Sequence, residues 1–144
     1  MTSTVHKGFV HTVRVHFDEL DQMGVLHNAR YALLFERALS AFWAGHGHAF
    51  RNGRPTTSDA FNVVKESTIT YIQPVRGAGE LAVHVWLAHI GSSSGDYRFE
   101  LTSTDGSVVY AHGRRVVVKL DPETQRPAPW SPESREIAQT LLRD

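Results

Sequence analysis

One segment of this chain has the periodicity of a long apolar helix, and such a helix needs a large surface to cover it. From Ala29 onward, large apolar side chains recur at helical spacing. They are Tyr31, Leu34, Phe35, Ala38, Leu39, Phe42 and Trp43. Asn28 is a suitable N-cap, and Gly45 and Gly47 end the helix, which gives a length of about 17 residues or ~26 Å. Because this apolar face is wide and aromatic, we expect a sheet to wrap around the helix.

Five other segments of the chain have the alternating pattern of β-strands. Residues 9–17 alternate β-forming and polar side chains before the helix. Further strand-like runs follow the helix, at 61–72, 80–90, 96–104 and 108–120. Turn-forming residues separate these runs, and Asp105-Gly106 is the clearest hairpin signal among them. Strands segregated from one long helix predict an α+β fold, in which a five-stranded antiparallel sheet packs on the helix.

The remaining segments are shorter. Residues 48–60 are polar, so we expect an irregular loop there. After a proline-rich connection, Ser131, Pro132 and Glu133 begin a short C-terminal helix. A chain of 144 residues without repeats fits one compact domain, so we assign residues 1–144 to a single domain.

The charge and cysteine content exclude several classes of protein. Fifteen Lys and Arg balance fifteen Asp and Glu, so no field of one sign exists to attract nucleic acid or an anionic membrane. No stretch approaches the ~20 apolar residues of a membrane span, and the N-terminus lacks the apolar core of a signal peptide. The absence of cysteine excludes disulfides, thiolate metal sites and cysteine nucleophiles. We therefore expect a cytoplasmic protein that binds neither nucleic acid nor membranes.

The candidate chemistry lies in residues 17–43, where Glu19 and Asp21 precede Gly24 and the start of the helix. A helix N-terminus offers unpaired backbone N–H groups and a partial positive charge, which suit a developing oxyanion. A loop that folds back at Gly24 could hold the Asp21 carboxylate opposite those donors. A base or nucleophile that faces an electrophilic donor is what acyl transfer needs. On the residues alone, a helix cap or a solvated loop acid is the commoner role of such an aspartate.

The string D-x-x-G-V-L-H-N-A-R-Y-x-x-x-F-E-R-A, which covers Asp21 to Ala38, resembles the 4-hydroxybenzoyl-CoA thioesterase-like branch of the hot-dog superfamily. Later segments are similar to the same family: S-x-x-x-Y-x-x-P-V-R-x-x-G-E-L from Ser67, then HIGSSS and RRVVVKLDPETQRPAP. The resemblance covers nearly the whole chain. Two positions depart from the family, Glu19 in place of the usual first acid of D-x-D and Leu39 in place of a common arginine.

This resemblance implies a fold, a reaction and an assembly. The helix is enclosed by the five strands, protomers pair their sheets edge to edge, and active sites lie at the interface of a homodimer or homotetramer. The substrate is an acyl-CoA or an acyl carrier protein thioester, and no metal or organic cofactor is needed. Asp21 matches the catalytic nucleophile or base, and Asn28 matches the residue whose backbone N–H polarises the thioester carbonyl. Gly24 lets the loop approach the acyl group, and His27 and Tyr31 match residues that line the acyl pocket.

Residues that bind the rest of the substrate are less constrained. Val63 and Val64, in the first strand-like run after the helix, would help to shape an apolar acyl pocket. The family has basic residues at the turn that reads GSSS here, at 91–94, so this chain lacks the family's cationic phosphate contact at that turn. Ser92 and Ser93 would instead bind a phosphate through their hydroxyl and N–H groups. The missing basic residues also leave room for a carrier protein as the substrate.

Other interpretations stay open from the sequence. Asp21 and His27 could form the Asp–His pair of a hot-dog hydratase or dehydratase, although the surrounding string differs. The same pocket without chemistry would make an acyl-CoA-binding sensor. His46 and His48 have a spacing that can bind metal, but no third ligand is apparent, so stabilising the helix C-terminus is the favoured role.

Overall fold

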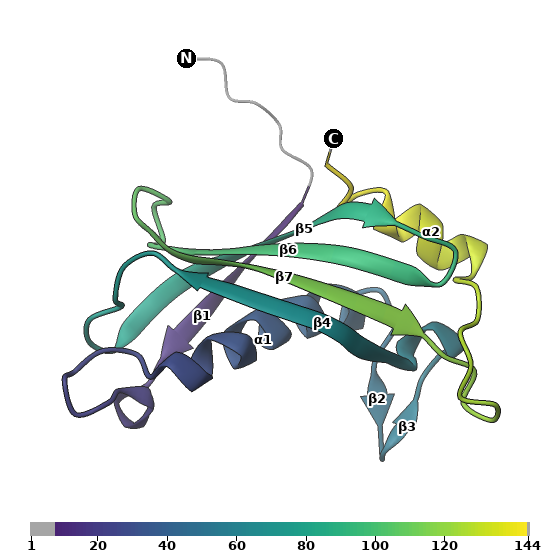
Figure 1. Cartoon of the computed structure of the whole chain (residues 1–144), viewed down its shortest axis with the longest axis horizontal. Coiled ribbons are helices and arrows are strands. Elements are labelled where there is room, and N and C mark those ends of the chain that lie inside the picture. Colours follow the sequence, from purple (N-terminus) through teal and green to yellow (C-terminus); the bar gives the residue numbers. More distant parts are fainter. Residues whose placement is uncertain (1–7, 144) are drawn as a thin grey trace.

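The computed structural model describes residues 8–143, and its main feature is a five-stranded antiparallel sheet that curves over helix α1 (Tyr31–Ala44) (Figure 1). The strands in spatial order are β1 (Phe9–Val15), β5 (Gly79–Ile90), β6 (Ser94–Thr102), β7 (Val109–Lys119) and β4 (Asn62–Tyr71). The short helix α2 (Pro132–Ala138) follows the sheet, with Ser131 as its N-cap. This arrangement confirms the α+β fold that the sequence predicts.

The segment 48–60, predicted to be irregular, contains a small hairpin. Strands β2 (Phe50–Arg51) and β3 (Arg54–Pro55) pair there, separately from the main sheet. The two residues between them, Asn52 and Gly53, both have positive φ angles, of 53° and 75°. Asn-Gly is the pair that such a two-residue hairpin turn favours, so the sequence did contain a signal for this hairpin.

The start of the long helix also differs from the prediction. A 3-10 turn over Asn28–Arg30 precedes α1, and His27, not Asn28, is its N-cap. The Nδ1 atom of His27 accepts a 3.1 Å hydrogen bond from the backbone N–H of Ala29. A ring nitrogen can satisfy a helix-terminal N–H as a serine or aspartate oxygen does, so the cap lies one residue earlier than expected.

Helix α1 packs closely on the sheet through Leu34, Phe35 and Ala38, all of which are buried. The ring of Phe35 stacks on that of Phe99 in β6, with centroids 4.8 Å apart. Below this ring lies Gly113 of β7, where an added β-carbon would stand only 2.8 Å from Cε2 of Phe35. The helix can approach the sheet this closely because position 113 has no side chain.

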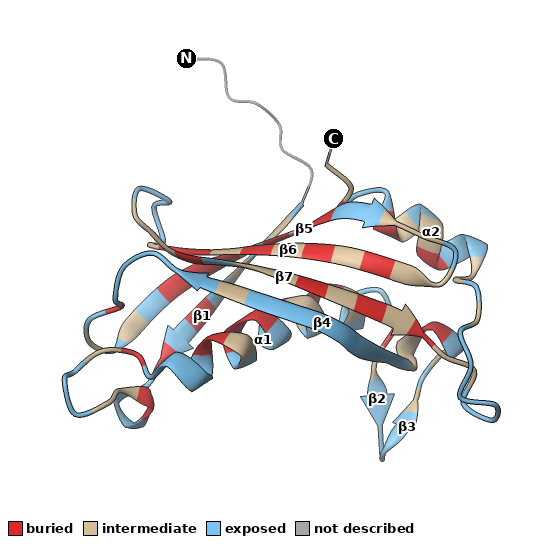
Figure 2. Cartoon of the chain, viewed as in Figure 1, coloured by how far each residue is buried: buried red, intermediate tan, exposed pale blue. Residues whose placement is uncertain are grey.

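Strand β4 is the least covered part of the sheet. It forms an outer edge, pairs with β7 on one side, and is exposed at every residue except Ile69 (Figure 2). Val63 and Val64 near its start are 45% and 53% exposed. An edge strand of this length presents unpaired backbone groups together with apolar side chains, and such an edge can pair with a strand of another chain.

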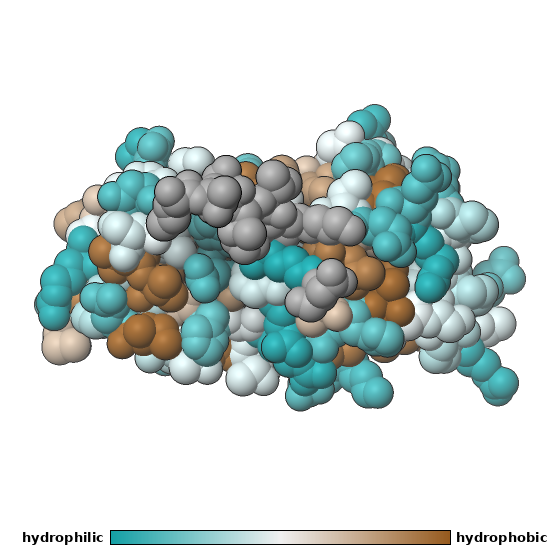
Figure 3. Space-filling model, turned by 90° about the horizontal axis from the view of Figure 1, so that it is seen from above, coloured by the Kyte–Doolittle hydropathy of each residue, from teal (hydrophilic) through white to brown (hydrophobic). Residues whose placement is uncertain are grey.

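Polar and apolar side chains are interspersed on the outer surface. In the view from above, brown apolar patches are separated by teal polar side chains (Figure 3). Within residues 8–143, no helix has the length and apolar character that crossing a bilayer requires.

Candidate active site

The loop between β1 and α1 folds tightly around Asp21. The backbone N–H of Asp21 donates to the carbonyl of Val25 (2.8 Å), and that of Gly24 donates to the carbonyl of Asp21 (3.0 Å). Gly24 has a φ of 76°, which glycine adopts without strain. Oδ1 of Asp21 accepts hydrogen bonds from the backbone N–H groups of Met23 (2.8 Å) and Val25 (3.3 Å). Oδ2 has no hydrogen-bond partner among the described residues, so this oxygen is available to a substrate or a water molecule.

The connection between β4 and β5 holds this loop in place. The N–H of Leu26 donates to the carbonyl of Val75 (2.9 Å), and the N–H of Gly77 donates to the carbonyl of Gly24 (3.0 Å). Leu26 and Val75 are both buried in the core. The position of the Asp21 loop therefore depends on a segment about fifty residues later in the chain, not only on its own sequence.

The start of the α1 region lies beside this loop. Asn28 is the first residue of the 3-10 turn, and its backbone N–H has no acceptor among the described residues. Its carbonyl oxygen accepts a 3.0 Å hydrogen bond from the hydroxyl of Tyr71, at the end of β4. The turn therefore presents an unpaired N–H at the positive end of the helix dipole. An N–H in this position suits a negatively charged oxygen.

The hydrogen bond at His27 limits what this side chain can do. Because Nδ1 accepts from the N–H of Ala29, a neutral His27 ring carries its proton on Nε2. Such a ring has no free lone pair with which to act as a general base. This geometry weighs against the Asp–His pair of a hydratase and favours a pocket role for His27.

One open hollow gathers several of the residues that the sequence analysis singled out. Its walls include Asp21, His27, Asn28 and Tyr31. Tyr31 is buried and packs edge-on against Tyr71, with ring centroids 4.8 Å apart. Burial raises the pKa of the Tyr31 phenol, so this side chain stays neutral and forms an apolar wall. A carboxylate, an unpaired N–H and an aromatic wall thus line the same hollow.

The hollow also contains residues that the sequence analysis did not single out. Tyr71 and Ile72, at the end of β4, line it and are about half exposed. Tyr71 is the tyrosine of the string that begins at Ser67, so a signal was present. Its contact with Asn28 could not be read from the sequence because the two residues are 43 positions apart.

Val63 and Val64 lie at the opposite end of β4. Val63 pairs with Val118 near the end of β7, whereas Tyr71 pairs with Ala111 near its start. At about 3.4 Å per residue, the two ends of β4 are ~30 Å apart. Within one chain the two valines therefore lie far from the Asp21 hollow, and their role in binding stays a prediction.

Ser92 and Ser93 lie at that same far end, in the turn between β5 and β6. Their backbone carbonyls accept hydrogen bonds from the N–H groups of Trp130 (3.0 Å) and Lys119 (2.7 Å), respectively. Residues 91–95 read G-x-S-x-G, but this turn joins two antiparallel strands, not the strand and helix of a nucleophile elbow. Phosphate binding by these serines also stays a prediction.

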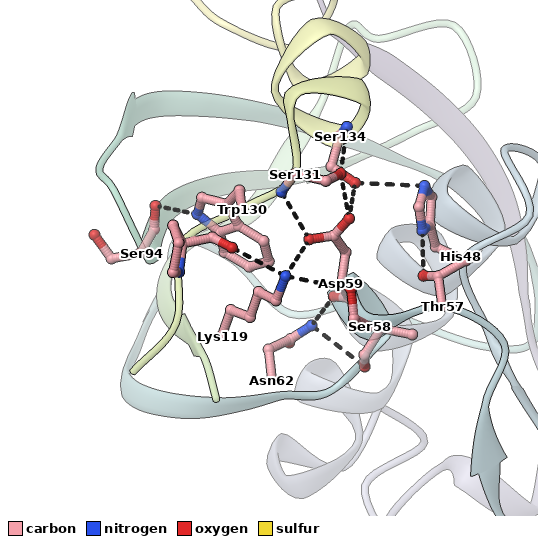
Figure 4. A network of polar contacts seen from close by, with 12 residues as sticks. His48, Thr57, Ser58, Asp59, Asn62, Ser94, Lys119, Trp130, Ser131 and Ser134 are labelled. Atoms are coloured by element: carbon pink, nitrogen blue, oxygen red, sulfur yellow. Dashed lines mark hydrogen bonds and ion pairs between the residues drawn. The ribbon is translucent and has the colours of Figure 1, made fainter. Parts of the chain in front are cut away.

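A buried polar network holds the C-terminal tail against the far end of α1 (Figure 4). The carboxylate of Asp59 accepts hydrogen bonds from Nζ of Lys119 (2.7 Å), from the backbone N–H and hydroxyl of Ser131, and from the hydroxyl of Ser134 (2.7 Å). Burial of Asp59 opposes its ionisation, but these hydrogen bonds outweigh burial and lower the pKa of the carboxyl. No local sequence pattern indicates this ion pair, because its members are 60 residues apart.

His48 joins the same network without forming a catalytic triad. Its Nδ1 lies 2.6 Å from the hydroxyl of Thr57, and its Nε2 lies 3.4 Å from the hydroxyl of Ser134. The carboxylate of Asp59 bonds to Ser134 directly, so no histidine stands between serine and acid as a triad requires. No cluster of metal-binding side chains occurs in the part of the chain that the structure describes.

A five-stranded antiparallel sheet curved over one long helix is the architecture of the hot-dog fold, and here a carboxylate and an unpaired helix-start N–H line one hollow beside it. The sequence profile of the Thioesterase superfamily matches residues 23–110, so this chain belongs to that superfamily. Membership supports thioester hydrolysis as the general class of reaction. No curated protein sequence gives a significant match.

Solved structures of other proteins share the fold. PA5185 from Pseudomonas aeruginosa PAO1 superposes with a TM-score of 0.81 at 22% identity, over 94% of this chain and 92% of that one. Slr0204, a 1,4-dihydroxy-2-naphthoyl-CoA thioesterase from Synechocystis, gives 0.80 at 13% identity, over 93% and 97%. SAV2348 from Staphylococcus aureus, solved in complex with CoA, gives 0.78 at 16% identity, over 100% and 91%. These similarities confirm the hot-dog fold.

Proposed function

We propose that this protein hydrolyses an acyl thioester of coenzyme A, with Asp21 as its catalytic carboxylate. The observation that carries the proposal is a single hollow in which Oδ2 of Asp21 and the N–H of Asn28 both lack a partner among the described residues. The CoA bound to the structurally similar SAV2348 supports coenzyme A as the carrier. An acyl carrier protein, which presents the same pantetheine arm, is the second candidate carrier.

The proposed reaction begins with attack on the thioester carbonyl carbon. Asp21 either adds its own oxygen, forming an anhydride that water then hydrolyses, or removes a proton from an attacking water. The carbonyl oxygen becomes negative and is stabilised by the Asn28 N–H, and one such donor contributes about 3–4 kcal/mol. The tetrahedral intermediate collapses as the C–S bond breaks and the thiolate leaves, to be protonated by Asp21 in the base route or by water in the nucleophilic route. The free acid is released at once in the base route and after hydrolysis of the anhydride in the nucleophilic route.

The active unit that we propose is a homodimer joined through β4. The exposed edge of this strand, with Val63 and Val64 uncovered, supports pairing with a second copy. Antiparallel pairing of the two β4 strands would extend the sheet across both chains. A homotetramer and a cytoplasmic location stay predictions.

The variant Asp21→Asn tests the proposal directly. The amide oxygen can still accept the hydrogen bonds from Met23 and Val25, so the loop should fold normally. We expect turnover of acyl-CoA, measured as thiol release, to fall by ~10²–10⁴-fold. Asp18→Asn, at an exposed position in the same region, is the matched control and should retain wild-type turnover. Wild-type turnover in Asp21→Asn would remove Asp21 from the mechanism.

Single-turnover hydrolysis in ¹⁸O-labelled water separates the two roles of Asp21. If Asp21 attacks the carbonyl and water then opens the anhydride at the Asp21 carboxyl carbon, the first turnover returns unlabelled oxygen to the product and leaves the label in the Asp21 carboxylate. If Asp21 acts as a base, the label appears in the product acid at once. Ligand binding without thiol release under any condition would instead identify an acyl-CoA sensor.

A further inference from the structure

The β2–β3 hairpin carries two arginines that face each other. Arg51 and Arg54 are direct partners across its two strands, and Asn52 and Gly53 form the turn between them. Both arginines are exposed, and neither side chain has a hydrogen-bond or ion-pair partner among the described residues. Like charges that lie directly opposite each other on a strand pair destabilise it. An anion bound between the two guanidinium groups would offset this repulsion.

The other pair of facing arginines in the described strands has an anion of its own. Arg98 and Arg114 are direct partners on β6 and β7, and the carboxylate of Asp96 binds both, at 3.0 and 3.3 Å. The hairpin has no such acid, because residues 45–58 contain neither Asp nor Glu. Asp59, the next acid along the chain, is buried in the network of Figure 4. A bound ligand is therefore the fitting source of an anion for the hairpin pair.

The base of the hairpin is held firmly, although its tip projects from the body of the molecule (Figure 1). The hydroxyl of Thr56 donates to the carbonyl of Gly47 (2.7 Å) and accepts from the N–H of Ala49 (2.8 Å). The N–H of Thr56 donates to the carbonyl of Ala49 (2.7 Å), and the hydroxyl of Thr57 lies 2.6 Å from Nδ1 of His48. Because the hairpin is already ordered, a ligand that binds it avoids the cost of ordering a loop.

The two sides of the hairpin differ in character. A second cavity, of about 460 Å³, lies beside α2, and the aromatic side chains of Trp43, Phe50 and Trp130 line it. Phe50 directly precedes Arg51, and successive side chains of a strand point to opposite sides. The side of the hairpin towards the cavity is therefore apolar, and its outer side carries the two arginines.

The proposed dimer relates the hairpin to the Asp21 hollow of the partner subunit. Asn62, the first residue of β4, lines the same cavity as Phe50, whereas Tyr71, the last, lines the Asp21 hollow. Within one chain these two ends of β4 are ~30 Å apart. Antiparallel pairing of two β4 strands would bring the start of one beside the end of the other. The hairpin of each chain would then stand near the hollow of its partner, at a distance from the reacting carbonyl.

We propose that Arg51 and Arg54 bind the phosphate groups in the nucleotide part of coenzyme A, when its thioester is held at Asp21 of the partner subunit. Guanidinium groups bind phosphate oxygens through paired, charge-assisted hydrogen bonds. The turn at 91–94 offers no cation for this purpose. This inference rests on the proposed function, and it deepens that function because the arginines favour coenzyme A over an acyl carrier protein, which lacks the nucleotide.

A binding measurement tests the phosphate contact without any turnover. Coenzyme A, as the free thiol, is titrated calorimetrically into the wild type and into the double variant Arg51→Gln/Arg54→Gln. We expect the double variant to have a Kd at least about tenfold higher, and added salt to weaken binding more in the wild type. Arg14→Gln, which removes an exposed arginine from β1, is the control and should bind as the wild type does. An equal Kd in the double variant, or no binding to the wild type, would overturn the inference.

Kinetics separate a phosphate contact from a structural role of the hairpin. An acyl-CoA and the S-acylpantetheine with the same acyl group differ only in the nucleotide and its phosphates. The double variant should raise KM for the acyl-CoA by at least about tenfold, keep kcat within about twofold, and leave kcat/KM for the S-acylpantetheine unchanged. Its unfolding temperature should not fall, because two repelling charges are removed. Equal losses on both substrates would overturn the phosphate contact.

The outcomes also keep this inference distinct from the proposed function. Arginine-dependent binding of coenzyme A would uphold the hairpin site even if Asp21→Asn retained full turnover. Asp21-dependent hydrolysis with an unchanged KM in the double variant would uphold the proposed function and overturn the hairpin site. A loss confined to acyl carrier protein thioesters would likewise overturn it, because the arginines would then contact the carrier protein and not a nucleotide.

Discussion

The hydroxyl of Tyr71 donates a 3.0 Å hydrogen bond to the backbone carbonyl of Asn28, so the end of an edge strand holds the first turn before the long helix. The N–H of the same Asn28 is the proposed oxyanion donor. The orientation of this residue therefore depends on strand β4, and the same strand would form the dimer interface. If β4 forms the dimer interface as proposed, this contact would couple assembly to catalysis.

Removing the Tyr71 hydroxyl should weaken catalysis more than stability. A hydrogen bond of this kind contributes about 1 kcal/mol, so Tyr71→Phe should lower kcat by roughly fivefold with little change in KM. Tyr71 is half exposed, so the unfolding temperature should stay close to that of the wild type. Tyr110→Phe, whose hydroxyl makes no hydrogen bond among the described residues, is the control. Equal kcat values for the wild type and Tyr71→Phe would show that this contact does not position Asn28.

A positive charge in the middle of β4 should dissociate the proposed dimer into monomers. Ser67 is exposed near the centre of the strand, so Ser67→Lys would place two like charges close to the proposed two-fold axis. We expect light scattering to give the mass of a monomer, and the rate of thiol release to be lower than in the wild type. Thr12→Lys makes the same change on β1, the opposite edge of the sheet, and should leave the dimer intact. A dimeric Ser67→Lys protein would contradict assembly through β4.

A side chain at position 113 should force the helix away from the sheet. Gly113→Ala would place a β-carbon 2.8 Å from the Phe35 ring and 3.1 Å from the carbonyl oxygen of Thr68. Overpacking of this kind costs about 1–3 kcal/mol, which urea denaturation can measure. Adding Phe35→Leu should make the cost of Gly113→Ala smaller, because the clashing ring is removed. Additive effects of the two changes would show that the ring contact is not the cause.

Because of the ion pair of Asp59 and Lys119, the free energy of unfolding should depend on pH in the acidic range. The pKa of folded Asp59 lies below its ordinary value of 3.8, so its ionised form stabilises the fold above about pH 4. This contribution is lost as the pH falls through the lowered pKa. Asp59→Asn leaves Lys119 buried and unpaired, which should cost about 3 kcal/mol at pH 7.

Thermal unfolding of the wild type and Asp59→Asn between pH 7 and pH 3 checks this prediction. The difference in unfolding temperature between the wild type and Asp59→Asn should be constant near neutrality and should become smaller below about pH 4. Asp18→Asn, at an exposed position, should follow the wild type throughout. A difference that does not change with pH would mean that ionisation of Asp59 contributes nothing to the fold.

The sequence predicted the elements of this fold well and their ends less well. The periodicity of 31–43 located α1, and alternation located all five strands of the main sheet to within a few residues. The β2–β3 hairpin was missed, although Asn52-Gly53 signalled it. His27, whose place in an acyl pocket stays a prediction, is the cap of the 3-10 turn, because its ring can accept a hydrogen bond from the N–H of Ala29.

The sequence by itself determined the identity of the helix face, the strand pattern and the motif from Asp21 to Asn28, because these depend on neighbouring residues and on local backbone preferences. Only the tertiary structure decided that β4 is an edge strand, that Tyr71 reaches Asn28, that Asp59 meets Lys119 and that an aromatic cavity forms beside α2. These features bring together residues far apart in the chain. Their partners are fixed by strand order and by how the helix packs on the sheet, and periodicity within a short segment carries no information about either.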